Sequence, residues 1–169
     1  NARDISREVA PSMQAISTFL GGRLPAEQYA FLFYLKDYTE FQDLVERRSF
    51  RFATLVKAFR AFVGQGFGAL EHGTSSVYFL PDFGNDFVFD EIADVCIHEF
   101  FHILTPLNLH SEEIGHFNYI DPKMSQHLWL YEGVTEYFAG ISQLKGGLIS
   151  EEEYLQLLTQ KIKSAKSFP

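Results

Sequence analysis

The sequence has a single cysteine, few basic residues and no long apolar run. Because Cys96 is the only cysteine among 169 residues, an internal disulfide is excluded, and its apolar neighbours predict a buried structural thiol rather than a nucleophile. The chain has 14 Lys and Arg against 22 Asp and Glu, and the resulting net charge of -8 argues against a nucleic-acid partner. No apolar run approaches the roughly 20 residues that a membrane span needs.

Apolar residues make up 46% of the chain and 18 residues are Phe, so we expect a folded globular protein. Its length suits one domain with a core of its own. There is neither an initiator Met nor a signal peptide, and we expect the chain to be excised from a longer protein. No repeat or linker divides it, so residues 1–169 are predicted to form a single domain.

Apolar periodicity and end signals predict the secondary structure. Helices are expected over residues 3–20, 90–104, 125–144 and 151–164, and strands over 29–35 and 75–80. Pro106 should stop the second helix, Pro81 the second strand, and Ser150 with Glu153 should form a capping box for the last helix. Residues 43–62 fit either a helix or another structure. Strands and helices come first and only helices follow, which predicts an α+β domain.

An H-E-x-x-H pentad, His98–His102, is the most informative motif. Two histidines four residues apart lie on one face of a helix, where both imidazoles can bind one metal ion. Glu99 follows the first histidine and could accept a proton from a water on that ion. The bland alternative is two histidines on an amphipathic helix. Because the neighbouring residues are apolar almost all round, the helix should be buried, and a metal would satisfy its polar side chains.

A third ligand is available in a second predicted helix. Glu132 would complete a His2Glu set for one Zn²⁺ and leave a fourth position open for water. Glu136 lies one helical turn further on and could accept the N–H of a ligand imidazole. The alternative is a solvated helix face, which the apolar and aromatic neighbours of both glutamates disfavour.

A second constellation lies upstream, in Gly68-Ala69-Leu70-Glu71-His72. Glycine before a glutamate would let a substrate backbone approach closely, and the Glu71 carboxylate could bind the α-amine of a peptide. On spacing alone, an ordinary turn leading into a strand is the better interpretation.

Along the chain, the three motifs follow one another as Gly68–His72, His98–His102 and the segment with Glu132 and Glu136. In this order they resemble the glycyl-aminopeptidase-type family of gluzincin metallopeptidases and, more distantly, the aminopeptidase-N group. The resemblance implies a thermolysin-like catalytic domain, zinc on His98, His102 and Glu132, catalysis by Glu99, and a peptide amino terminus near Gly68, Ala69 and Glu71. It also implies a longer protein with a β-rich domain before this segment, often a PDZ domain after it, and a secreted or periplasmic location.

The sequence departs from the aminopeptidase-N group in two respects. The connection between His102 and Glu132 is longer, and it carries His110 and His116. No tyrosine after Glu132 matches the one that stabilises the oxyanion in that group, since Tyr137 and Tyr154 are the only candidates. The segment alone could therefore bind metal without full activity.

Two other functions remain open at this point. One is a non-catalytic peptide-binding or scaffold domain that retains the metallopeptidase fold, and the other is an endopeptidase. The remaining histidines, at positions 72, 110, 116 and 127, are expected to be surface or hydrogen-bonded residues rather than zinc ligands.

Overall fold

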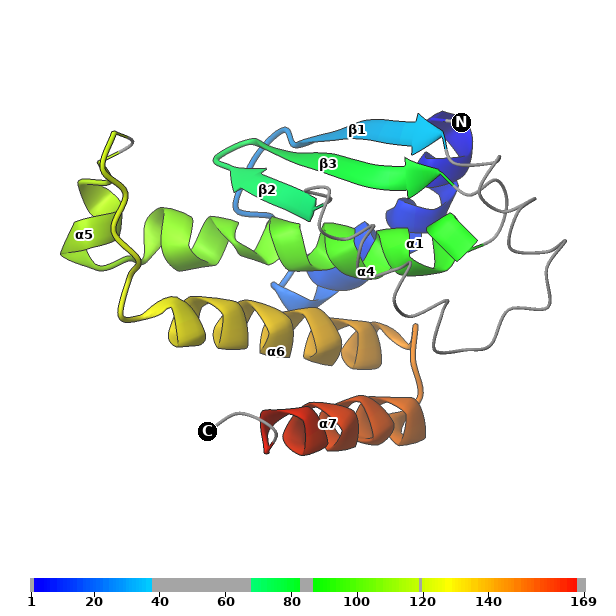
Figure 1. The fold of residues 1–169 in the computed structure, drawn as a ribbon. Helices are drawn as coiled ribbons and strands as arrows, with labels where there is room; N and C mark the ends of the chain where they lie inside the picture. Colours follow the sequence, from blue (N-terminus) through cyan, green and yellow to red (C-terminus); the bar gives the residue numbers. More distant parts are fainter. Residues whose placement is uncertain (1, 38–67, 83–86, 119, 167–169) are drawn as a thin grey trace, which may run out of the picture.

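A small sheet lies on one side of the molecule (Figure 1). The computed structural model describes residues 2–37, 68–82, 87–118 and 120–166. Its elements are α1 (Ala2–Phe19), β1 (Ala30–Asp37), β2 (Gly68–His72), β3 (Ser75–Asp82), α4 (Phe87–Phe101), the π-helical segment η1 (Ile103–Asn108), α5 (Glu112–Gly115), α6 (Leu128–Gly146) and α7 (Glu151–Ala165). α4, α6 and α7 lie in succession below the sheet (Figure 1). The fold is therefore α+β, as the order of the predicted elements indicates.

The sheet has the strand order β1-β3-β2. β3 pairs with β1 in parallel and with β2 in antiparallel orientation, so β2 borders only one other strand of the described sheet. β3 continues through Pro81, where the sequence predicted its end. Pro81 is tolerated because the register of β2 stops at Phe79, so among the described strands the backbone beyond that point pairs with β1 alone.

α4 is the central helix, and its side chains contribute to both core clusters. One cluster joins α4 to α1 and α6 and contains Ile16, Ile97, Phe100, Phe101, Ile103 and Ala139. The other joins α4 to α1 and the sheet and contains Ile5, Val9, Tyr78, Ile92 and Cys96. Cys96 is fully buried, and burial raises the pKa of its thiol to about 12, which agrees with a structural thiol.

The helix ends follow the sequence signals closely. Gly21 and Gly22 have positive φ angles after α1, and Gly147 has φ 73 directly after α6. α7 begins with the predicted capping box, in which the Ser150 hydroxyl accepts from the backbone N–H of Glu153. The prediction for 43–62 lies outside the described residues.

α4 ends three residues before its predicted end, since its α-helical part stops at Phe101. The chain continues as η1, in which Leu107 and Leu109 donate to carbonyls five residues earlier, at His102 and Leu104. Thr105 is extended (φ -138, ψ 124) because it precedes Pro106, which disfavours helical backbone at that position. Pro106 thus interrupts the helical backbone at the residue before it, directly after the predicted end at Leu104.

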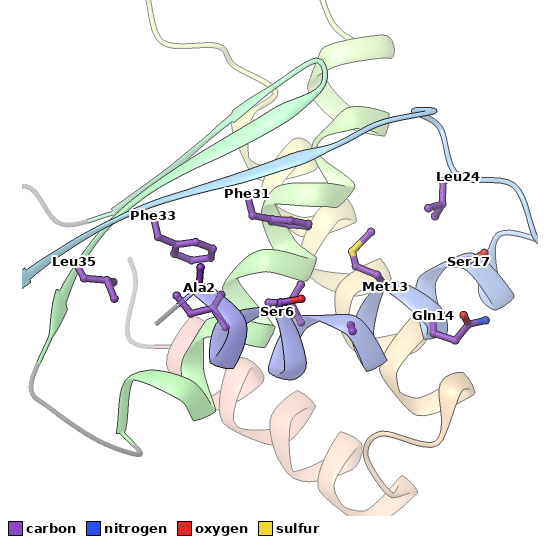
Figure 2. A pocket seen from close by; sticks show the side chains of 12 residues that line it. Ala2, Ser6, Met13, Gln14, Ser17, Leu24, Phe31, Phe33 and Leu35 are labelled. Atoms are coloured by element: carbon purple, nitrogen blue, oxygen red, sulfur yellow. The ribbon is translucent and has the colours of Figure 1, made fainter.

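An apolar groove of about 900 Å³ runs between α1 and β1. Figure 2 shows the side chains of Phe31, Phe33 and Leu35 on β1 facing α1, which contributes Ile5, Val9 and Met13. None of the described helices is long and apolar enough to cross a membrane.

The contact between α1 and α6 is close at Gly146. A Cβ there would lie 2.3 Å from Cβ and 3.1 Å from Cα of Ala15, whereas a Cβ at Gly133 on the same helix would meet nothing within 4 Å. The absence of a side chain at Gly146 thus lets the C-terminal end of α6 approach α1.

We predict that Gly146→Ala lowers the free energy of unfolding by about 1–3 kcal/mol, because the two helices must move apart. The matched control Gly133→Ala should be neutral or raise it by up to about 1 kcal/mol, since alanine favours helix where space is open. Urea denaturation followed by circular dichroism measures both. Equal free energies of unfolding for the two variants would contradict a close contact between Gly146 and Ala15.

Candidate metal centre

The histidines of the pentad lie at the C-terminal end of α4. His98 is in its last turn, and His102 directly follows Phe101 with helical dihedral angles (φ -60, ψ -17). The helical path therefore continues through His102, and the two imidazole centroids lie 4.8 Å apart. The spacing of four residues puts both rings on one face of the helix, as the sequence predicts.

Glu132 reaches both histidines from α6. Its Oε2 lies 3.1 Å from Nε2 of His98 and 3.8 Å from Nε2 of His102. One carboxylate oxygen thus faces the same ring nitrogen of two imidazoles, although 30 residues of sequence separate Glu132 from His102.

The other ring nitrogen of each histidine is already hydrogen-bonded. Nδ1 of His98 donates to Oε2 of Glu136 at 2.9 Å, and Nδ1 of His102 donates to the carbonyl of Thr105 at 2.9 Å. With a proton on Nδ1, the lone pair of each imidazole is on Nε2, the nitrogen that faces Glu132. Both rings are therefore oriented for one shared ligand.

Thr105 and Thr135 lie behind His102, and sequence reasoning missed both. The fully buried hydroxyl of Thr135 lies 3.2 Å from Nδ1 of His102 and donates to the Thr105 carbonyl at 3.3 Å. Thr135 lies one turn after Glu132, so helical spacing could have suggested it. The position of the Thr105 carbonyl depends on the extended backbone before Pro106. No pattern of side chains in the sequence predicts that this carbonyl accepts from His102.

Glu99 lies beside the two imidazoles. The ligand-type atoms of His98, Glu99 and His102 all lie within 4.8 Å of one another. Glu99 is only 7% exposed, and its Oε2 is buried without a hydrogen-bond partner among the described residues. A buried, unpartnered carboxylate oxygen is costly, so its place beside two imidazoles points to an absent polar group.

Burial and the surrounding charges set the protonation of the site. Burial raises the pKa of Glu99, whereas the hydrogen bond with His98 lowers the pKa of Glu132. Burial lowers the pKa of His98, but hydrogen bonds to Glu132 and Glu136 outweigh it and raise the value to about 9. A cation between these groups would replace the proton on His98, since a ligating imidazole must be neutral.

The donor set fits a zinc ion. Two imidazole nitrogens and a carboxylate oxygen are ligands that zinc prefers, and ligand atoms at 2.0–2.1 Å around a tetrahedral ion lie about 3.3 Å apart. The distances of 3.1 and 3.8 Å from Glu132 to the two Nε2 atoms are close to this spacing. Glu132 contacts both imidazoles with one oxygen, so it suits the third position better than Glu99.

β2 carries the upstream constellation beside α4. Its residues alternate in exposure, with Ala69 and Glu71 facing inward and Gly68 and His72 exposed. The Glu71 charge contributes to the raised pKa of Glu99, so the two carboxylates lie near each other. Ala69 packs against the core, and a Cβ on Gly68 would meet nothing within 4 Å. Of the three predicted substrate contacts, only Glu71 therefore has a side chain near the site.

The other histidines lie away from this cluster. His127 precedes α6 and pairs with Glu113 at 3.3 Å, and Nδ1 of His110 donates to the Pro106 carbonyl. His72 and His116 are exposed. None of the four belongs to a group that could hold a metal in the part of the chain that the structure describes.

The family model described as M61 glycyl aminopeptidase matches residues 91–169, slightly less than half of the chain. This segment begins in α4 and includes the pentad, Glu132 and Glu136. Residues 91–169 are therefore similar to the M61 glycyl aminopeptidase family. The family resemblance that the motifs suggest is thereby confirmed for this part of the chain.

The fold is similar to a crystal structure described as an aminopeptidase N family protein from Idiomarina loihiensis. The TM-score is 0.62 at 21% sequence identity, and the match covers 94% of this chain and 24% of the other. This chain thus spans about a quarter of the length of that relative. No curated protein matches the chain.

Proposed function

We propose that this chain contains the catalytic centre of a zinc-dependent peptidase with a thermolysin-like, gluzincin-type domain. The observation that carries the proposal is the contact of one Glu132 oxygen with Nε2 of both His98 and His102, whose Nδ1 atoms are engaged elsewhere. The family match over residues 91–169 supports a peptidase. The fold similarity supports a peptidase-like arrangement of helices and sheet.

In this proposal, His98, His102 and Glu132 hold the zinc ion. Bound there, zinc supplies a Lewis acid that polarises the scissile carbonyl and makes water more acidic. Glu136 and the Thr105 carbonyl keep both imidazoles in the orientation that the ion requires. Glu99 accepts a proton from the attacking water and delivers it to the nitrogen of the leaving amine.

We further propose that the substrate is a peptide with a free amino terminus. Glu71 lies on the inward-facing side of β2, and its charge acts on Glu99. The Glu71 carboxylate could pair with the ammonium group of the first residue and so set where hydrolysis occurs. Among the described strands, β2 has a neighbour on one side only, so its other side could pair with an extended peptide.

Glu99→Gln should retain zinc and reduce peptide hydrolysis by about 10²–10⁴-fold, because the amide cannot accept the proton. The matched control is Glu113→Gln, since Glu113 also pairs with a histidine but lies outside the site. Steady-state kinetics and metal analysis of both variants provide the measurement. Full activity in Glu99→Gln would exclude Glu99 as the base, and peptide binding without turnover by the unsubstituted protein would favour a non-catalytic domain.

Blocking the amino terminus distinguishes an aminopeptidase from an endopeptidase. We expect an acetylated peptide to be hydrolysed about 10²-fold more slowly than its free form, since it would leave the partly buried Glu71 carboxylate without its ammonium partner. Glu71→Gln should reduce this preference by lowering activity on the free peptide alone. Equal rates on the two peptides would contradict the role of Glu71 and indicate an endopeptidase.

A further inference from the structure

A pocket of about 590 Å³ between α4, α6 and α7 lies next to the proposed metal centre. His98 and Glu99 line it from α4, Glu136 from α6, and Lys161 from α7. Its described lining contains three carboxylates, those of Asp94, Glu99 and Glu136, and Lys161 is the one lysine or arginine among them. A third helix, α7, therefore brings the positively charged side chain of Lys161 to the edge of the site.

Lys161 contacts His98 indirectly, through Glu136. Its Nζ donates to Oε1 of Glu136 at 2.6 Å, and Oε2 of the same carboxylate accepts from Nδ1 of His98 at 2.9 Å. Each oxygen of Glu136 thus has a different partner, and the three side chains form a continuous series from α7 to the metal centre. The contact to the ammonium group is short, as charge-assisted hydrogen bonds are.

Glu136 needs a second partner to hold its orientation. Its side chain is 42% exposed, so one hydrogen bond leaves the carboxylate free to rotate about its terminal bond. Lys161 contacts the oxygen that His98 does not use, and its charge also acts on Asp94. The carboxylate of Asp94 repels that of Glu136, and the ammonium group of Lys161 offsets part of that repulsion.

α7 is anchored at a defined distance from α6, which allows Lys161 to reach Glu136. The Tyr154 ring packs over Gly140, where an added Cβ would lie 3.0 Å from it. Lys161 lies two turns after Tyr154 on the same helix. The capping box fixes the first residue of α7, so the register of the whole helix is set at Ser150.

We propose that Lys161 is a positioning residue that acts through Glu136 to orient His98 for metal binding. The inference rests on the proposed function, because it concerns the same metal centre. It assigns a role to α7, which carries no residue of the motifs. Neither sequence spacing nor a motif points to Lys161, since its partner lies on another helix.

The test is zinc affinity of the chain, measured by competition with a chromophoric chelator, for Lys161→Met and for the control Lys163→Met. Lys163 lies on the same exposed turn and makes no ion pair with a described residue. We expect Lys161→Met to weaken zinc binding about threefold to fivefold, the upper range for a partly exposed ion pair, and Lys163→Met to leave it unchanged. Lys161→Arg should restore the affinity because it keeps the charge.

A double-mutant cycle tests the route through Glu136. In a Glu136→Gln background, which itself should weaken zinc binding about 10–100-fold, Lys161→Met should change the affinity by less than about twofold. The visible spectrum of the Co²⁺-loaded chain should shift in Lys161→Met and not in Lys163→Met, since it reports the geometry of the ligands. A merely structural effect of α7 would not move this spectrum.

Two outcomes would overturn the inference while the proposed function stands. One is equal zinc affinity in Lys161→Met and Lys163→Met, and the other is an undiminished effect of Lys161→Met in the Glu136→Gln background. If the unsubstituted chain binds no zinc, the proposed function fails, and the role of Lys161 fails with it.

Discussion

The arrangement of the site depends on the packing of α6 against the end of α4. This packing brings Glu132 to Nε2 of both His98 and His102, and Glu136 to Nδ1 of His98. Three carboxylates and two imidazoles meet at a largely apolar helix interface, where unpaired charges would be costly. A divalent cation, as proposed, would balance the carboxylates and satisfy the imidazole lone pairs at once, which would explain why these polar groups gather there.

The rest of the fold supports this interface. α4 is held from above by the sheet and from the side by α1, and α1 also contacts the end of α6 at Gly146. The extended backbone at Thr105 interrupts the helical dihedral angles, and its carbonyl accepts a hydrogen bond from His102. The ring orientation at the site therefore depends on backbone geometry as much as on side chains.

Much of this could be predicted from the sequence. Helical spacing predicted that His98 and His102 share one face of a helix and that Glu132 and Glu136 share a face of another, and the structure places the side chains in this way. Their roles in metal binding and catalysis stay predictions. The helix ends at Gly21, Gly147 and Ser150 were also readable, because glycine and capping residues act locally. The α+β class followed from the order of elements.

The remaining features depend on contacts between distant segments. The Thr105 carbonyl acts through its backbone, and Lys161 reaches Glu136 across two helices whose packing no local pattern determines. The inward direction of Ala69 is decided by the register of β2 against β3. The expectation of a close substrate approach at Gly68 stays a prediction, and a Cβ there would meet no atom of the described residues within 4 Å.

The most direct test of the central claim is the metal content of the chain after zinc loading and dialysis, by elemental mass spectrometry, with Glu132→Ala and Glu113→Ala beside it. The account predicts about one zinc per chain in the unsubstituted protein and in Glu113→Ala, and loss of the ion in Glu132→Ala. Zinc retained in Glu132→Ala, or no zinc in the unsubstituted chain, would contradict it.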